Sequence, residues 1–324
     1  MRRENEEAQR GETTARKAVV MLNANANSGR AGSVGESIRG IVNEIDSDAE
    51  VVETRNADEG RRAIQTAVEQ GRGPLVICGG DGTVRSAAST LLEMESKTPL
   101  GIVPLGTGND YAFGTLGLPS DVREALEVAL HGRPRAIDVA RANNEWVTNI
   151  LAAGLAGNVA WDVENMLERG SSWARGPARY TISILRQIIL FYNRLPVLEV
   201  TIDGKRWGKS QMLTIAAMIG PTSGNGYRLA PQADPYDGQL DVLLMRKMPR
   251  LKALRVLPMT KDGRHLGVRE IEMLRGKEIT LRSEKPIQAH VDGDPIRSHS
   301  FDVRIVPGGL TVMTPAKEAS TARK

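Results

Sequence analysis

Residues 75–90 read LVICGGDGTVRSAAST, and they indicate the fold class most clearly. Its first part, Leu75–Cys78, is an apolar run with the length of a strand buried on both faces. The glycine-rich segment Gly79–Thr83 follows, and Val84–Glu93 then has the spacing of a helix. A loop of this kind lets the backbone approach a ligand closely, and the helix start supplies free N–H donors. The stretch therefore predicts an α/β fold with a site for phosphate groups.

The same alternation of strand and helix extends over residues 18–140. Apolar runs predict strands at 19–23, 51–53, 75–78 and 100–103. Helical spacing predicts helices at 33–45, 57–70, 84–93 and 121–131. Repeated units of this kind favour a mostly parallel sheet covered on both faces, which is a three-layer α/β domain.

The second half of the chain has a different pattern. Leu198, Val200 and Ile202 alternate with polar residues and lead into Asp203-Gly204, a hairpin turn signal. Further strands are expected at 212–219, 240–246, 278–282, 287–291 and 301–306, with helices at about 159–169 and 177–193. This pattern predicts an antiparallel β-sandwich.

Four segments are expected along the chain. Residues 1–17 form a disordered tail, 18–140 a nucleotide-binding domain and 141–308 the sandwich. Residues 309–324 contain a strand that returns to the first domain and then a second tail, of which 315–324 is the disordered part.

Composition narrows the classes of function. The 324 residues carry a formal charge of +4 and a single cysteine, so an internal disulfide is excluded and a reducing compartment fits. The four histidines are scattered, which makes a zinc site of the usual kinds unexpected. Aromatic residues are few and form no base-stacking motif, so no nucleic-acid partner is expected. The charged N-terminus has no apolar signal segment, which favours a cytoplasmic protein.

Two further loops of similar composition follow strands of the expected parallel sheet. Residues 25–30 (NANSGR) follow the first strand, and residues 105–110 (LGTGND) follow the strand at 100–103. Since the carboxyl ends of parallel strands open on one edge, the three loops should converge on one crevice. Asp81 is placed there to hold Mg²⁺ or polarise a nucleophile, although it could also simply cap a helix in a tight turn.

Six sequence blocks in order resemble the diacylglycerol kinase catalytic-domain family, and most of all its bacterial lipid kinases, which are related to the sphingosine kinases. The blocks are NANSGR (25–30), GGDGT (79–83), PLGTGND (104–110), AIDVA with WVTNILAAGLAG (136–157), APQADPYDGQLDV (230–242) and HVDGDP (290–295). The resemblance covers roughly residues 18–314. GGDGT alone is shared with NAD kinases and phosphofructokinases, so the resemblance implies a first domain of that type.

The resemblance also implies roles for individual residues. Contacts with ATP would come from Asn25, Ser28, Gly29, Arg30, Thr54, Gly79, Gly80, Asp81, Gly82, Thr83, Gly106, Thr107, Gly108 and Asn109. The general base would be Asp292 or Asp294, with Asp81 helping to place the metal. Asp294 stands where the family usually has a glutamate, one methylene longer, so the choice between the two stays open. A structural Mg²⁺ would be held by Asp234, Asp237 and the Gln239 carbonyl.

The activity so implied is an ATP- and Mg²⁺-dependent kinase for a hydroxyl of a membrane lipid, on a cytoplasmic protein peripherally attached to the membrane. Diacylglycerol is the first acceptor expected, while phosphatidylglycerol, a sphingoid base and a polyprenol-like alcohol stay open. The rivals are a kinase for a soluble acceptor such as NAD and a non-catalytic lipid- or nucleotide-binding regulator. The helix expected at 177–193 either shields acyl chains and touches the membrane or packs on the sandwich. A homodimer is left open.

Overall fold

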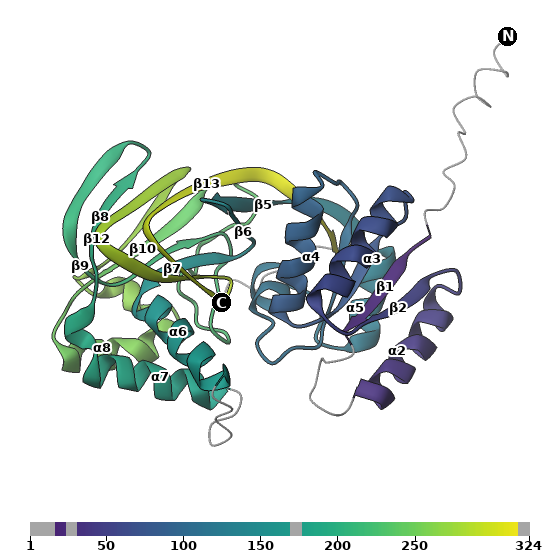
Figure 1. Cartoon of the computed structure of the whole chain (residues 1–324), viewed down its shortest axis with the longest axis horizontal. Coiled ribbons are helices and arrows are strands. Elements are labelled where there is room, and N and C mark those ends of the chain that lie inside the picture. Colours follow the sequence, from purple (N-terminus) through teal and green to yellow (C-terminus); the bar gives the residue numbers. More distant parts are fainter. Residues whose placement is uncertain (1–16, 24–30, 169–176, 317–324) are drawn as a thin grey trace, which may run out of the picture.

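The computed structural model describes residues 17–23, 31–168 and 177–316. The chain forms an α/β domain and a β-rich domain that lie side by side (Figure 1). The expected disordered tails fall almost wholly outside the described residues, as does the expected loop at 25–30.

The first domain is a parallel sheet with the strand order β2-β1-β3-β4. The strands are β1 (Val19–Asn23), β2 (Glu50–Thr54), β3 (Leu75–Gly79) and β4 (Leu100–Pro104). The helices are α2 (Ala31–Ile45), α3 (Ala57–Glu69), α4 (Asp81–Glu93) and α5 (Val122–His131), with a π-helical turn at Tyr111–Thr115. The expected α/β class is confirmed.

Alternate residues of β1 show why the domain has three layers. Val19 and Met21 pack in a cluster with residues of α3 and α4, whereas Val20 and Leu22 pack with residues of α2 and α5. Successive side chains of a strand point to opposite faces, so a strand that is apolar throughout needs helices on both.

The second domain is built from antiparallel strands. They are β5 (Arg133–Ala142), β6 (Glu145–Val147), β7 (Ile150–Gly154), β8 (Val197–Ile202), β9 (Lys205–Met218), β10 (Leu240–Arg246), β11 (Ile271–Gly276), β12 (Glu278–Val291) and β13 (Asp294–Thr314). One apolar cluster lies between the strands. A second lies under helices α6 (Leu155–Glu168), α7 (Pro177–Leu190) and α8 (Arg250–Val256).

The long strand β13 joins the two domains. Its first part pairs with β12, its middle and end pair with β5, and Val312 pairs in parallel with Leu100 of β4. The chain therefore finishes its last strand beside the sheet of the first domain (Figure 1).

Some elements differ from those that the sequence predicts. Helix α4 begins at Asp81 rather than Val84, so the GGDGT segment includes its first turn. The expected strands at 278–282 and 287–291 form the single strand β12, whose register against β13 shifts between Arg282 and Ile287. Strand β11 and helix α8 were not expected. No helix among the described residues is long and apolar enough to cross a membrane.

Candidate active site

Two of the three glycine-rich loops touch each other backbone to backbone. A Cβ atom on Gly106 would lie 2.5 Å from the Cα atom of Gly80, and one on Gly80 would lie 3.1 Å from the Cα atom of Gly106. The Leu105 N–H donates to the Gly79 carbonyl at 2.9 Å. The second and third loops therefore meet at the carboxyl edge of the sheet, and only glycine leaves room for this approach.

Several of the side chains expected to contact ATP are already engaged within the protein. Thr54 is buried, and its hydroxyl lies 3.4 Å from the Leu22 carbonyl. Asn109 closes on Gly106, accepting from its N–H at 3.0 Å and donating to its carbonyl at 2.7 Å. The Thr83 hydroxyl accepts a hydrogen bond of 3.1 Å from the Asn23 amide. The hydrogen bonds of these side chains therefore stabilise the conformation of the loops and the strand ends beside them.

Other members of the set lie at the loop surface. Gly82 and Thr107 are exposed, and the backbone of Gly108 lies beside Asp81, where an added Cβ would be 3.1 Å from an Asp81 carboxylate oxygen. The first-turn N–H groups of α4 begin at Asp81. The structure thus brings the segments 79–83 and 106–109 together. Asn25, Ser28, Gly29 and Arg30 lie outside the described residues.

Asp81 lies next to a second carboxylate. Burial first, and then the negative charge of Asp110, raise the pKa of Asp81 above its ordinary value. The Asp110 carboxylate also contacts the second domain. It accepts hydrogen bonds from the N–H groups of Asn225 and Gly226 at 2.6 and 2.7 Å. The third loop is therefore fixed to the second domain by its last residue.

The two candidate bases have opposite surroundings. Asp292 is buried and its two oxygens accept four hydrogen bonds: from the Thr148 N–H and hydroxyl, and from the N–H groups of Asn149 and Ile150. Burial raises the pKa of Asp292, and these hydrogen bonds lower it. The side chain of Asp294 is 58% exposed. Asp292 thus holds the turn between β12 and β13, whereas the Asp294 carboxylate is exposed.

Arg85 is a functional candidate that the sequence did not single out. It lies on α4 two residues after Thr83, and its guanidinium binds Asp294 and donates to Glu145 at 3.0 Å. Its Nε atom is buried, 3.9 Å from Asp292. Glu145 lies 60 residues from Arg85 in the sequence, and Asp294 lies more than 200 residues away. No local spacing could therefore have identified this cluster.

His290 supports the same turn. Its Nδ1 atom accepts a hydrogen bond of 3.2 Å from the Gly293 N–H. Burial, and then the charge of Arg85, lower the pKa of His290 to about 4. The imidazole is therefore neutral near pH 7 and acts as an acceptor.

The two aspartates expected to hold a structural Mg²⁺ are both engaged with groups of the protein itself. The Asp237 carboxylate accepts from the Gln239 N–H at 3.0 Å, and its other oxygen binds Arg275. One oxygen of Asp234 accepts from the Tyr236 N–H at 3.1 Å. Among the described residues no group of three or more His, Cys, Asp or Glu side chains is placed to hold a metal ion. Because an arginine holds Asp237, this loop does not fit a divalent cation as it stands.

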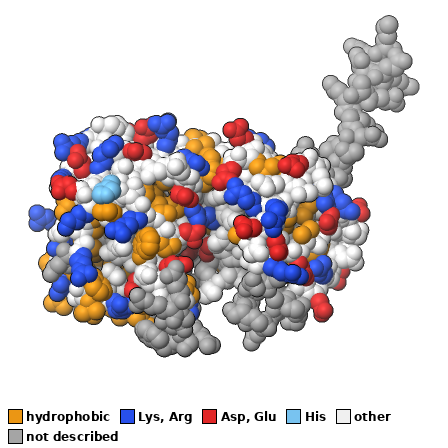
Figure 2. Space-filling view, viewed as in Figure 1, with side chains coloured by type: hydrophobic (Ala, Val, Ile, Leu, Met, Phe, Trp, Pro, Cys, Tyr) orange, Lys and Arg blue, Asp and Glu red, His pale blue; other side chains and the backbone are white. Residues whose placement is uncertain are grey.

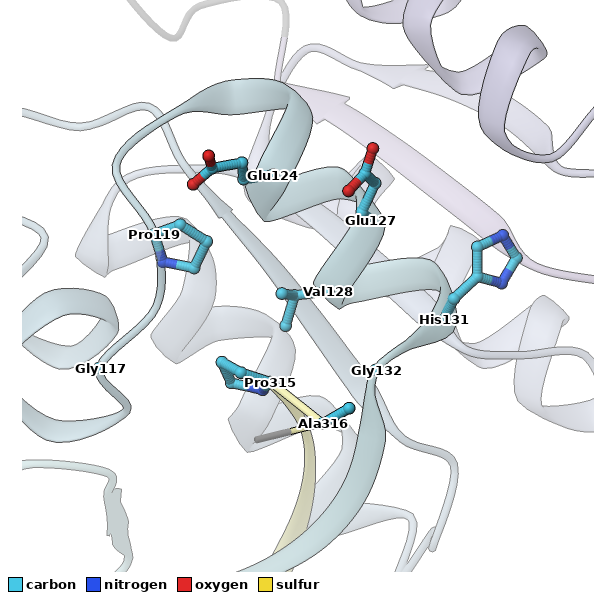
Figure 3. A pocket seen from close by; sticks show the side chains of 9 residues that line it. All are labelled: Gly117, Pro119, Glu124, Glu127, Val128, His131, Gly132, Pro315 and Ala316. Carbon is cyan, nitrogen blue, oxygen red and sulfur yellow. The ribbon is translucent and has the colours of Figure 1, made fainter. Parts of the chain in front are cut away.

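A separate pocket of about 430 Å³ lies along α5 (Figure 3). Glu124, Glu127 and His131 line one side of it, and Pro315 and Ala316 the other. None of the expected site residues lines this pocket.

Two family descriptions match the chain. Residues 17–142 match the diacylglycerol kinase catalytic domain, and residues 150–314 match the YegS C-terminal NAD kinase beta sandwich-like domain. The expected combination of an α/β domain with a β-sandwich is thereby confirmed.

Individual relatives agree with this assignment. The chain is 31% identical over 270 residues to a diacylglycerol kinase of Mycobacterium tuberculosis, with 80% of this chain and 82% of that protein covered. It is 29% identical over 300 residues to a protein of Chromohalobacter salexigens named "Probable lipid kinase YegS-like", with 91% and 93% covered. A crystal structure of a diacylglycerol kinase from Bacillus anthracis has the same fold, with a TM-score of 0.70, 18% identity and 92% and 97% of the two chains covered. The chain belongs to the diacylglycerol kinase family of lipid kinases.

Proposed function

We propose that this protein transfers the γ-phosphoryl group of ATP, with Mg²⁺, to a hydroxyl of a membrane lipid, and that diacylglycerol is the acceptor. The observation that carries the proposal is the meeting of Arg85 with Asp294. It brings an exposed carboxylate of the second domain to the helix that starts in the phosphate loop. Phosphoryl transfer needs little more than positioned phosphates, charge neutralisation and a group that orients the attacking hydroxyl.

The phosphates of ATP would be bound by backbone donors. The start of α4 offers N–H groups and a favourable dipole, and the close contact of Gly80 with Gly106 keeps side chains out of the crevice. Asp81 fits a role as ligand of the Mg²⁺ that accompanies ATP, because a cation would offset its repulsion from Asp110. A bound Mg²⁺ would neutralise charge on the phosphates.

The proton of the acceptor hydroxyl would go to Asp294. Asp292 is a poor candidate because each of its oxygens already accepts two hydrogen bonds. Arg85 would orient the Asp294 carboxylate toward the incoming hydroxyl. We assign Arg85 as a positioning residue, since it acts through Asp294.

A lipid acceptor is supported by the distribution of exposed apolar side chains. Eight large hydrophobic side chains are exposed among the described residues, and six of them lie on α6, α7 or α8. The six are Leu167, Tyr180, Leu185, Ile189, Leu190 and Leu251. Figure 2 shows hydrophobic side chains mixed with Lys and Arg along the lower left edge, where Figure 1 has α7 and α8. Apolar and basic groups together suit an anionic membrane surface.

This apolar helical face begins near the phosphate loops. Partial burial, and then the charges of Asp81 and Asp110, raise the pKa of Tyr180 near the start of α7. Ile189 and Leu190 at the other end are 56% and 63% exposed. A lipid could therefore remain partly in the bilayer against α7 while its hydroxyl reaches the crevice. The protein would bind the membrane peripherally.

The test is transfer of labelled γ-phosphate from ATP to a panel of acceptors in mixed micelles containing Mg²⁺. The panel holds diacylglycerol, phosphatidylglycerol, a sphingoid base and a polyprenol, with NAD and a blank without acceptor. Label in diacylglycerol that disappears in Asp81→Asn supports the proposal. Asp302→Asn is the matched control, because Asp302 is an exposed carboxylate on β13 bound to Thr280. Label in NAD alone, or ATP binding without transfer to any lipid, would refute the lipid-kinase assignment.

A further inference from the structure

The loop at residues 230–239 connects the two domains. Ala230 packs in the apolar cluster under the helices of the second domain, whereas Tyr236 packs against the core of the first. Asp138 of β5 fixes the loop, because its N–H donates to the Pro235 carbonyl at 2.9 Å and its carboxylate accepts from the Gly238 N–H at 2.6 Å. The conformation of this loop therefore bears on how the domains are held together.

The loop and the strand that follows it concentrate negative charge. Asp234, Asp237 and Asp241 lie within eight residues, and Asp241 is only 3% exposed. Carboxylates taken out of water need a cation or several hydrogen-bond donors. Divalent cations prefer oxygen ligands of the kind present here, so a metal ion is one solution and a basic side chain is another.

Arg275 supplies such a side chain. It stands directly opposite Asp241 in the antiparallel pair of β10 and β11, a register that brings the two Cβ atoms close. Its guanidinium binds the Asp237 carboxylate, and its Nε atom lies 3.7 Å from an Asp241 oxygen. The position of Arg275 is thus set by the sheet and not by a flexible loop.

We infer that Arg275 is the resident cation of this interdomain loop and that it makes a divalent metal unnecessary there. Its guanidinium binds Asp237 and has its Nε atom beside Asp241, and a planar guanidinium with five N–H donors suits two carboxylates at once. Removal of this charge leaves the oxygen ligands in place, so a hard cation should then be able to enter. The inference concerns the loop alone and does not depend on which acceptor the kinase uses.

The experiment compares melting temperatures of the full chain without nucleotide, in EDTA and in millimolar MgCl₂ or CaCl₂. Wild type should melt at the same temperature in all three. Arg275→Met, which keeps an apolar side chain, should melt about 2–6 °C lower in EDTA and regain part of the loss in Mg²⁺ or Ca²⁺. Arg275→Lys should stay insensitive to metal. Arg304→Met is the matched control, because Arg304 forms an exposed pair with Glu278 in the same domain, and it should show no metal response.

A second measurement covers the case in which Arg275→Met does not fold. Calorimetric titration of Ca²⁺ into nucleotide-free wild type and Asp237→Asn should give indistinguishable results, since wild type does not use Asp237 to bind metal. A Ca²⁺- or Mg²⁺-dependent rise in the melting temperature of wild type that disappears in Asp237→Asn would overturn the inference. So would an Arg275→Met protein that behaves like Arg304→Met.

Discussion

Arg85 and Asp294 form an ion pair that joins helix α4 of the first domain to strand β13 of the second. The same guanidinium binds Glu145 on β6, so three segments distant in sequence meet at one side chain. The side chain of Arg85 is only 13% exposed, whereas that of Asp294 is 58% exposed. The largely buried Arg85 therefore holds in place a carboxylate that is exposed to solvent.

Replacement of Arg85 by glutamine should lower kcat by about 10²-fold, because a carboxylate that is misplaced by about an ångström orients the attacking hydroxyl poorly. Binding of ATP should change little. Arg85→Lys should recover part of the lost rate. Steady-state kinetics with lipid and with ATP would measure the split between kcat and KM.

Arg123→Gln is the control for Arg85. Arg123 pairs with Glu44 on the surface of the first domain, away from the crevice. A kcat that falls equally in both variants would show that Arg85 has only a structural role.

Replacement of Gly106 by alanine should disrupt the phosphate crevice. The new Cβ would lie 2.5 Å from the Gly80 Cα and 2.7 Å from an Asn109 side-chain oxygen, and backbone cannot yield cheaply. We expect the free energy of unfolding to fall by about 1–3 kcal/mol and ATP affinity to fall with it. Calorimetry of ATP binding and thermal unfolding would measure both.

Gly60→Ala is the matched control for Gly106→Ala, since a Cβ on Gly60 of α3 meets nothing within 4 Å. It should leave ATP binding intact and stabilise the protein by about 0.5–1 kcal/mol. Unchanged ATP affinity in Gly106→Ala would contradict the described contact between the loops.

The neutral state of His290 predicts a pH dependence of stability. Its pKa is about 4 in the folded protein, against 6.5 for the ordinary side chain. The unfolded chain therefore binds a proton first, and this contribution to stability, about 3 kcal/mol, is present above pH 6.5 and lost as the pH falls toward 4.

The melting temperatures of wild type and His290→Asn at several pH values would test this contribution. The advantage of wild type over the variant should shrink between pH 7 and pH 5. His131→Asn, at an exposed position on α5, should show no such trend. A difference between wild type and His290→Asn that stays constant with pH would contradict the assignment of a neutral imidazole.

The apolar helical face predicts a change in membrane binding. A double variant with Ile189→Asn and Leu190→Asn should bind vesicles containing phosphatidylglycerol more weakly, by about tenfold for each residue replaced. Each of these side chains would otherwise be buried in the membrane interface. Vesicle sedimentation would measure it. Phe113→Asn is the control, since Phe113 is the exposed large hydrophobic side chain among the described residues of the first domain. Equal binding by all three proteins would exclude α7 as the membrane contact.

The order of strands and helices in the first domain could be predicted because each element is decided locally. The apolar runs of β1 and β3 and the helical spacing of α3 are complete within a few residues. The contact of the second and third phosphate loops followed from parallel strand topology alone.

Contacts that depend on strand register have no local signal in the sequence. The register of strand β12 shifts between Arg282 and Ile287. Because the residues between them are mostly polar, the sequence pattern indicated two separate strands there. Arg85 and Arg275 each contact carboxylates on segments that are distant in the sequence. Neither arginine lies in a sequence motif that would predict these ion pairs. The choice between Asp292 and Asp294 likewise needed the four hydrogen bonds that occupy Asp292.

The most direct test of the proposed function is a comparison of Asp294→Asn and Asp292→Asn in the transfer of γ-phosphate from ATP to diacylglycerol. Asp294→Asn should keep its melting temperature and its ATP affinity but lose about 10²–10⁴-fold in kcat. Asp292→Asn should instead melt at a lower temperature, because an amide N–H₂ would face backbone N–H donors. Full transfer by a folded Asp294→Asn protein would contradict the assignment of Asp294 as the group that accepts the hydroxyl proton.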